Sequence, residues 1–219
     1  MIPCECAGHE RADRIVLTGG PGAGKTAVLE LIRQHFCRHV RVLPESASIL
    51  FGGGFPRGGP VEALGAAQRA IYHVQHELEA AVAAQTEAAI LLCDRGTVDG
   101  AAYWPAAGDL FTAVGTRAED ELGRYRAVIH LRVPSADAGY DHSNPLRIES
   151  AVEAAAIDLR IAQAWQAHPR RHVVESTADF LTKAKQALDI LRTYLPECCR
   201  RHLVPVLDRT SVEQTQRTR

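Results

Sequence analysis

Several classes of protein are made improbable by what this sequence lacks. No apolar run among the 219 residues approaches the roughly 18 needed to cross a bilayer, and residues 1–14 mix charges without the apolar stretch of a signal peptide. The positive charges of the 25 Lys and Arg residues nearly cancel the negative charges of the 26 Asp and Glu residues. The chain therefore lacks the excess of basic residues that is typical of a nucleic-acid-binding protein. We expect a cytoplasmic protein with no membrane or nucleic-acid partner.

Metal-binding patterns are also scarce. The six cysteines form no C-x-x-C pair, and no spacing among the ten histidines stands out. Cys4 and Cys6 would meet Cys198 and Cys199 only if the two ends of the chain lay close together, so free thiols in a reducing compartment are expected instead. Cys93 lies in an apolar run and is expected in the core. A zinc site thus has little support from spacing.

One stretch, GGPGAGKT at 19–26, fits the phosphate-loop pattern G-x-x-x-x-G-K-[ST] at every fixed position. A strand-like apolar run precedes it at 14–18, and apolar residues at helical spacing follow over 26–36. In such a loop, backbone N–H groups and the lysine hold the phosphates, and the Thr hydroxyl is a ligand of Mg²⁺. The residues expected to bind the nucleotide are Gly20, Pro21, Gly22, Ala23, Gly24, Lys25, Thr26 and Ala27.

Lysine is rare in this chain, which sharpens the motif. Of the 25 Lys and Arg residues, only Lys25, Lys183 and Lys185 are lysines. The other basic residues are arginines, and the planar guanidinium group of arginine does not replace the compact ammonium group of lysine. A lone lysine within the loop therefore indicates a functioning phosphate site.

Strand-like apolar runs recur along the chain and alternate with helical patterns. Strands are expected at 14–18, 40–43, 88–93, 127–131 and 171–174, and helices at 26–36, 61–86, 117–125, 149–167 and 179–195. Alternation of this kind predicts an α/β fold with a five-stranded parallel sheet flanked by helices. We expect a flexible lead-in at 1–12, one domain at 13–197, and a disordered tail at 198–219.

Two finer expectations concern the later helices. In the 149–167 helix, Val152, Ala156, Leu159 and residues 162–165 are expected on the apolar face. Ser176 or Thr177 is expected to cap the 179–195 helix.

Acidic residues follow two of the expected strands, at the sheet edge where ligands bind in open α/β folds. Asp94 ends the 88–93 run and is the acid expected to hold the Mg²⁺ water shell beside Thr26, or to act in catalysis. Glu45 follows the 40–43 strand and is either a general base or water ligand of Mg²⁺, or an acid that the dipole favours at a helix N-terminus.

Residues around these acids are candidates for binding the second substrate. Arg95 either contacts the phosphoryl acceptor or pairs with Asp94. Tyr103 belongs to an aromatic cluster at 97–115, which either lines an acceptor pocket or packs under a loop. Arg57 lies in the Gly-rich segment 51–60, where no regular element is expected and which is either a lid or clamp or an ordinary mobile loop. With Glu45, these side chains are the predicted acceptor site.

Arginines flank the loop that follows the 127–131 strand. A mobile loop with arginines is what phosphoryl transfer needs, because guanidinium offsets charge on the transferred group. Arg147 is favoured over Arg132 for this role, and surface salt bridges are the alternative.

These residues together resemble a known family. RIVLTGGPGAGKT at 14–26, PE at 44–45 and CDRG at 93–96 look like the small NadR-like P-loop ATPases, whose relatives phosphorylate nucleosides, nucleotides or similar small molecules. The resemblance spans about 14–195 and implies a P-loop NTPase fold of the nucleoside and nucleotide kinase type. It places Lys25 and Thr26 on the triphosphate and Mg²⁺, Asp94 on metal or as base, Glu45 near the acceptor, and Arg147 in a lid. Such lids usually carry closely spaced arginines, which this loop lacks.

The leading hypothesis is an ATP- and Mg²⁺-dependent phosphotransferase with an unidentified small-molecule acceptor. ATP is preferred to GTP because the guanine-reading N-K-x-D signature is missing, TKAK at 182–185 ending in a base where an acid is needed. The alternatives are a regulatory NTPase that switches a partner interaction with water as acceptor, and a nucleotide-binding module without catalysis.

Overall fold

Five parallel strands form the centre of the molecule. The computed structural model describes residues 8–134, 150–176 and 179–200. The strands are β1 (Asp13–Thr18), β2 (Val40–Leu43), β3 (Ile90–Asp94), β4 (Ala127–Leu131) and β5 (Arg171–Val174), in the order β2-β3-β1-β4-β5. Val16 pairs with Cys93 of β3 on one side and with Val128 of β4 on the other. Because β1 is central, the loop that follows it emerges at the middle of the sheet's carboxyl edge, where α/β folds bind ligands.

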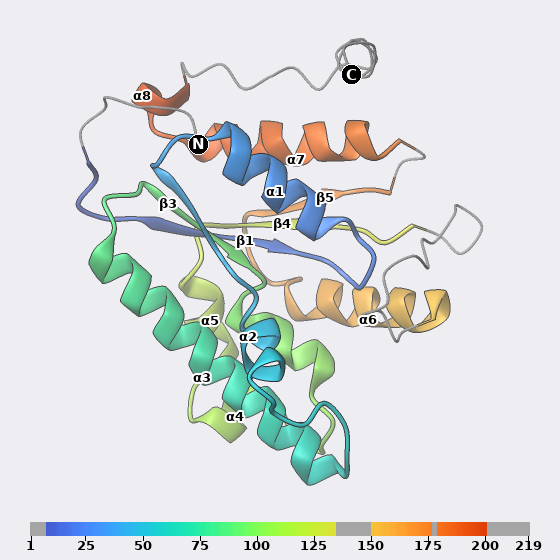
Figure 1. Ribbon diagram of the computed structural model, residues 1–219. Coiled ribbons are helices and arrows are strands. Elements are labelled where there is room, and N and C mark those ends of the chain that lie inside the picture. The colour runs from blue at the N-terminus through green and yellow to red at the C-terminus, as the bar shows by residue number, and fades with distance from the viewer. Residues whose placement is uncertain (1–7, 135–149, 177–178, 201–219) are drawn as a thin grey trace.

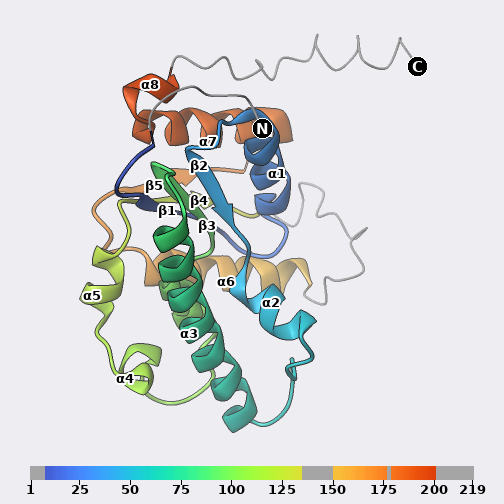
Figure 2. The ribbon, with the colours of Figure 1, turned by 60° about the vertical axis from the view of Figure 1, so that its left-hand side comes forward.

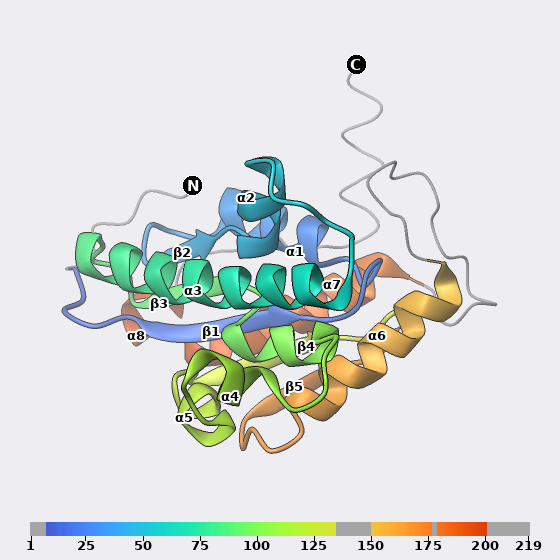
Figure 3. The same ribbon diagram turned by 90° about the horizontal axis from the view of Figure 1, so that it is seen from below.

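Helices cover both faces of this sheet (Figures 1 and 2). One face carries α1 (Lys25–His35), α7 (Phe180–Tyr194) and the short α8 (Glu197–Arg200). The other carries α3 (Val61–Gln85) and α6 (Ala151–Ala164), with the short η1 (Thr97–Tyr103), α4 (Leu110–Val114) and α5 (Ala118–Gly123) beside them, as Figure 3 shows from below. Helix α2 (Ser46–Gly52) follows the carboxyl end of β2 and packs against α3.

The core is divided by the sheet into two apolar layers. Ile15 and Leu17 of β1 face α1 and α7, whereas Val16 between them faces the layer of α6. This alternation is the two-residue period of a strand whose faces are both covered. Trp165, which follows α6, is fully buried in the second layer.

The predicted α/β sheet of five parallel strands is confirmed, and three strands have the expected bounds. The expected apolar face of α6 was wrong in its first half, although Trp165 at its end is buried as expected. Val152 and Leu159 are 74% and 54% exposed, whereas Ile157 and Ile161 face the core. Ser150 and Glu153 form a capping box that sets the start of α6.

Two other local expectations were wrong. Asp179, rather than Ser176, caps α7: its carboxylate accepts hydrogen bonds from the N–H groups of Leu181 and Thr182. Thr177 lies outside the described residues. The Gly-rich segment is not wholly irregular, because α2 includes Phe51 and Gly52.

Among the described residues, no helix is both long and apolar enough to span a bilayer.

Candidate active site

The phosphate loop joins β1 to α1 in a conformation that requires glycine. Gly19 has a φ of 141°, and a Cβ there would lie 2.1 Å from the carbonyl oxygen of Leu131. Gly24, at the N-terminus of α1, has a φ of 92°, and a Cβ there would lie 2.9 Å from the ring of Phe180. These positions therefore need glycine for both backbone conformation and close packing, and the loop ends on a helix N-terminus that favours an anion.

Lys25 is held over this loop by backbone carbonyl groups. Its Nζ donates to the oxygens of Gly19 at 2.8 Å and Gly20 at 3.3 Å. Burial and the nearby charge of Arg95 lower the pKa of Lys25 to about 8, although Asp94 and Glu45 act in the opposite direction. Lys25 is thus still mainly an ammonium group at neutral pH, with its charge poorly solvated and available for an anion.

A buried carboxylate on α6 fixes the start of the loop. The N–H of Gly20 donates to Asp158 Oδ1 at 2.9 Å, and His130 Nε2 lies 2.9 Å from the same oxygen. Arg132 Nε lies 3.1 Å from Asp158 Oδ2. Burial opposes ionisation of Asp158, but the bonds from His130 and Gly20 lower its pKa below the ordinary value. The N–H of Gly20 is therefore engaged by Asp158 in this structure, and the assignment of Gly20 to the nucleotide stays a prediction. Arg132 forms a salt bridge with Asp158, which is the alternative to a role in phosphoryl transfer.

Lys183 of α7 supports the loop from the other side. Its Nζ donates to the carbonyl oxygen of Ala23 at 2.9 Å and also to that of Arg132. The side chain is buried, and burial lowers its pKa to about 8. One ammonium group thus ties the phosphate loop to the end of β4, a role that the sequence pattern around 182–185 did not reveal.

A cavity of about 740 Å³ opens in front of the loop. This volume lies within the usual range for small-molecule sites. The structure brings together around it nearly all of the side chains that the sequence singled out. Those lining it are Pro21, Gly22, Ala23, Gly24, Lys25, Thr26, Ala27, Glu45, Arg57, Asp94, Arg95 and Tyr103.

Asp94 ends β3 beside the phosphate loop. Among the described residues its Oδ1 is buried and has no hydrogen-bond partner. Burial and the carboxylates of Glu45 and Asp99 raise the pKa of Asp94 to about 6, while Lys25 and Arg95 limit the rise. An acid with an open buried oxygen next to Thr26 is the donor set that a hydrated Mg²⁺ ion takes.

Arg95 does not pair with Asp94 but links two other acids. Its Nε donates to Glu45 Oε1 at 2.7 Å and its Nη1 to Asp99 Oδ1 at 3.2 Å. Its guanidinium lies 5.4 Å from the centre of the Tyr103 ring. Burial opposes the charge, yet Tyr103, Glu45 and Asp99 raise the pKa of Arg95 above its ordinary value. Its backbone has a φ of 68°, uncommon outside glycine, which points to a site where tertiary contacts fix the conformation.

Glu45 is the residue before α2 and also lines the cavity, so both of its sequence interpretations stay open. Burial favours its neutral form, but Arg95 and a 2.6 Å hydrogen bond from Ser48 lower its pKa below the ordinary value. Both carboxylate oxygens of Glu45 therefore already accept hydrogen bonds in this state.

Asp99 is the acid that the motif search missed. It is buried in η1 and accepts from Thr18, from Arg95, from the N–H of Gly96 at 3.0 Å and from Trp165 Nε1 at 3.1 Å. It thereby connects the end of β1, the start of η1 and the end of α6. Its spacing of four residues from Arg95 was the available signal.

Arg147, the predicted lid arginine, lies outside the described residues. So does most of the predicted tail, although 197–200 forms α8.

Comparison with known proteins agrees with this geometry. A family model described as an AAA domain matches residues 14–183. The structure is similar to that of thymidylate kinase from Candida albicans, with a TM-score of 0.53 and 12% sequence identity over 84% of this chain and 92% of that one. A search of curated protein sequences found no match.

An identity of 12% establishes likeness of fold alone, and this fold is the P-loop kinase-like α/β fold that the sequence predicted. The closer relation to NadR-like proteins stays a prediction. The family match spans most of the chain, from β1 to the first turn of α7, and includes the phosphate loop and Asp94. This chain therefore belongs to the AAA domain family.

Proposed function

We propose that the protein is an ATP- and Mg²⁺-dependent phosphotransferase that acts on a small metabolite. The observation that carries the proposal is the cavity itself, which is lined both by the phosphate loop and by the linked charges of Glu45, Arg95 and Asp99. A nucleotide on the loop would share this cavity with these charged groups. They are the groups available to hold a second substrate beside the terminal phosphate.

The phosphate loop would hold the nucleotide by positioning and charge. The N–H groups of residues 22 and 24–26 and the ammonium of Lys25 are the donors offered to the phosphates. Lys25 now donates to two backbone oxygens, and phosphate oxygens would replace them as acceptors. Because the loop is fixed by Asp158 and Lys183, little reorganisation is needed when charge develops in the transition state.

The residues beside the loop fit a magnesium ion. Thr26 would supply a hydroxyl, and the open Oδ1 of Asp94 would accept from a metal-bound water. Bound Mg²⁺ would offset the charge of the phosphate oxygens. The preference for ATP over GTP rests, as before, on the missing guanine signature.

The two acids would have different roles in transfer. Asp94 is better placed than Glu45 to receive a proton from the acceptor hydroxyl, because both oxygens of Glu45 already accept hydrogen bonds. Glu45 would position Arg95, whose charge would bind the acceptor or offset charge on the transferred group. Arg147 remains a candidate for a second such arginine.

The far part of the cavity suits an anionic or planar acceptor. Arg57 lies 5.0 Å above the Phe51 ring, and Arg95 lies over Tyr103, so cations and aromatic faces occur together there. Gln68 and Tyr72 also line this cavity and add polar groups to it. These features favour a nucleoside, a nucleotide or a similar hydroxylated metabolite, and the fold of a thymidylate kinase supports that class.

A screen with γ-labelled ATP and a panel of nucleosides, nucleotides and sugars tests the proposal. We expect label to appear in one acceptor class, with the product identified by mass. Release of label only as inorganic phosphate, at a rate that no metabolite changes, would contradict it and favour the regulatory NTPase. A nucleotide-dependent partner recovered in a pull-down would then support that alternative.

A further inference from the structure

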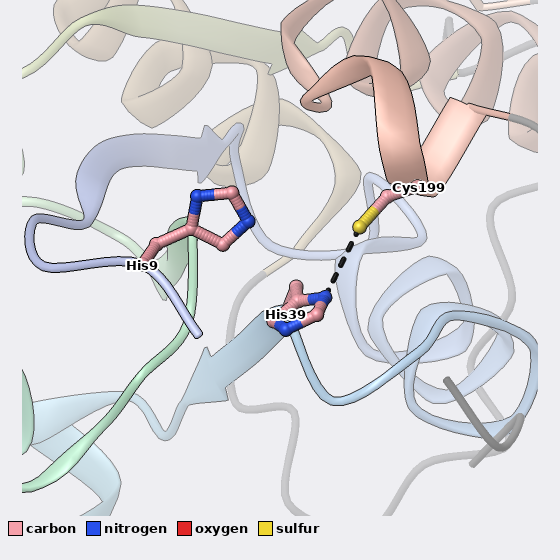
Figure 4. A group of neighbouring side chains, drawn as sticks. All are labelled: His9, His39 and Cys199. Carbon is pink, nitrogen blue, oxygen red and sulfur yellow. Dashed lines mark hydrogen bonds between the residues drawn. The ribbon is translucent and has the colours of Figure 1, made fainter. Parts of the chain in front are cut away.

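A cluster of histidine and cysteine side chains lies at the edge of the sheet opposite the phosphate loop. His9 precedes β1, His39 immediately precedes β2, and Cys199 belongs to α8. One ligand atom from each of the three lies within 4.8 Å of those of the other two. Figure 4 shows the two imidazole rings and the sulfur gathered around a common space.

Cys37 brings a second sulfur to this cluster. Its Sγ lies 3.6 Å from Cys199 Sγ and 3.8 Å from His39 Nδ1, and His39 Nδ1 lies 3.2 Å from Cys199 Sγ. Tetrahedral Zn²⁺ with ordinary bond lengths would separate two sulfurs by about 3.8 Å and a sulfur from a nitrogen by about 3.6 Å. The three distances differ from these values by at most about 0.4 Å. Cys37 is not a member of the group whose ligand atoms all lie within 4.8 Å of one another, so its side chain would shift toward His9 when an ion binds.

We propose that His9, Cys37, His39 and Cys199 form a structural zinc site. All four residue types are preferred ligands of Zn²⁺, and two of each make one of its common closed sets. Cys37, His39 and Cys199 are at most 4% exposed, so the ion would be shielded from solvent. Binding would form two zinc–sulfur and two zinc–nitrogen bonds, and the two thiols would release their protons to solvent.

The position of the cluster indicates a structural role. The carbonyl oxygen of His39 accepts from the N–H groups of Ala89 and Ile90, and the N–H of His9 donates to the carbonyl of Glu87. Zinc would therefore join the segment before β1, the start of β2 and α8, all far from the phosphate loop in a parallel sheet. The ligands come from three distant parts of the sequence, which explains why spacing alone did not reveal them.

Cobalt titration of the full chain tests the proposal. The protein would be reduced, nucleotide-free and stripped with chelator, and then titrated with Co²⁺ and competed with Zn²⁺. We expect one equivalent to produce a thiolate-to-cobalt charge-transfer band and tetrahedral d–d bands. Cys37→Ser should weaken the charge-transfer band by about half, because one of two thiolates is lost. His9→Ala and Cys199→Ser should weaken Co²⁺ binding by more than the roughly 10- to 100-fold known for outer-shell partners.

Matched controls separate this site from the rest of the chain. Cys93→Ala and His73→Ala remove residues of the same types outside the cluster, and Asp94→Asn removes the acid of the candidate active site. All three should keep the cobalt spectrum. A Cys4→Ser, Cys6→Ser double variant should keep it as well.

The zinc proposal is independent of the proposed function, because loss of ATP turnover would leave the cobalt spectrum unchanged. It would be overturned if wild type gave no one-equivalent thiolate band, or if the band survived in both His9→Ala and Cys199→Ser. A metal-free disulfide between Cys37 and Cys199 in protein purified without reductant would also overturn it. His9 is only half-buried, so its variant remains informative if Cys199→Ser does not fold. Zinc removal should lower Tm and speed hydrogen exchange in α8.

Discussion

Asp94 gives the sharpest quantitative prediction, because the same burial that suits it to catalysis costs stability. A rise of its pKa from 3.8 to about 6 corresponds to about 3 kcal/mol against ionisation in the folded state. Asparagine resembles the protonated acid in shape and carries no charge. Asp94→Asn should therefore raise the free energy of unfolding while it abolishes phosphoryl transfer.

The pH dependence has a definite sign. Between pH 3.8 and about 6 the folded state binds more protons at Asp94 than the unfolded state does, so wild type loses stability as pH rises through this window. The advantage of the asparagine variant should grow from about 1.5 kcal/mol at pH 5 to about 3 kcal/mol at pH 7. Asp94 keeps some solvent exposure, so these are upper values. Lys25, with a pKa of about 8, sets the upper limit of the useful range.

Thermal unfolding of metal-free, nucleotide-free protein from pH 5 to 7 is the assay. For a chain of this size, 3 kcal/mol corresponds to a Tm shift of roughly 6–12 °C. Asp109→Asn is the control with opposite sign, since hydrogen bonds from Thr112 lower the pKa of this exposed helix cap. It should not stabilise at pH 7. An Asp94→Asn variant that is less stable than wild type, or whose gain does not change with pH, would refute the reasoning.

Three further substitutions probe the supports of the site. Asp158→Asn weakens a buried charge network at nearly constant volume and should cost about 2–3 kcal/mol in urea unfolding; an unchanged midpoint would contradict its anchoring of Gly20. Lys183→Met removes two hydrogen bonds that hold the phosphate loop, worth about 1 kcal/mol each, and should weaken ATP binding about tenfold in calorimetric titration. Equal affinity would show that the loop needs no such support. Arg95→Lys keeps the charge but loses the guanidinium group that links Glu45 to η1. We expect the KM for the acceptor to rise and the KM for ATP to stay unchanged. The reverse pattern would assign Arg95 to nucleotide binding.

The sheet was predictable because its strands are short apolar runs bounded by turns, a signal that is local in sequence. Elements η1, α4 and α8 were not predicted, and α2 was anticipated only as one interpretation of Glu45. They have seven residues or fewer, and tertiary contacts rather than periodicity decide such short helices. The face of α6 was misjudged because Asp158 lies in its buried stripe. The pattern treats an acid as exposed, whereas this one is compensated by His130 and Arg132.

The candidate site divides in the same way. The phosphate loop and the Asp94-Arg95 pair could be found from the sequence because the residues of each motif are adjacent in the chain. Trp165 and Lys183 could not, because their partners lie far away in the chain: Trp165 is 66 positions from Asp99, the acid it contacts. Asp99 itself could be noticed only through its spacing of four residues from Arg95. The His9–Cys199 cluster is the extreme case, since its ligands are distant from one another as well as from any motif.

The most direct test of the central claim is the rate of γ-phosphoryl transfer measured for the Lys25→Ala variant, with Lys185→Ala as a matched control. Lys185 is half-exposed and pairs with Asp189 on the surface, whereas Lys25 lies on the phosphate loop. Removal of an ammonium with a lowered pKa should leave folding intact. We predict that Lys25→Ala lowers the transfer rate by at least about 100-fold and that Lys185→Ala retains it. Equal transfer by wild type and a folded Lys25→Ala variant would contradict the assignment of this cavity as the site of phosphoryl transfer.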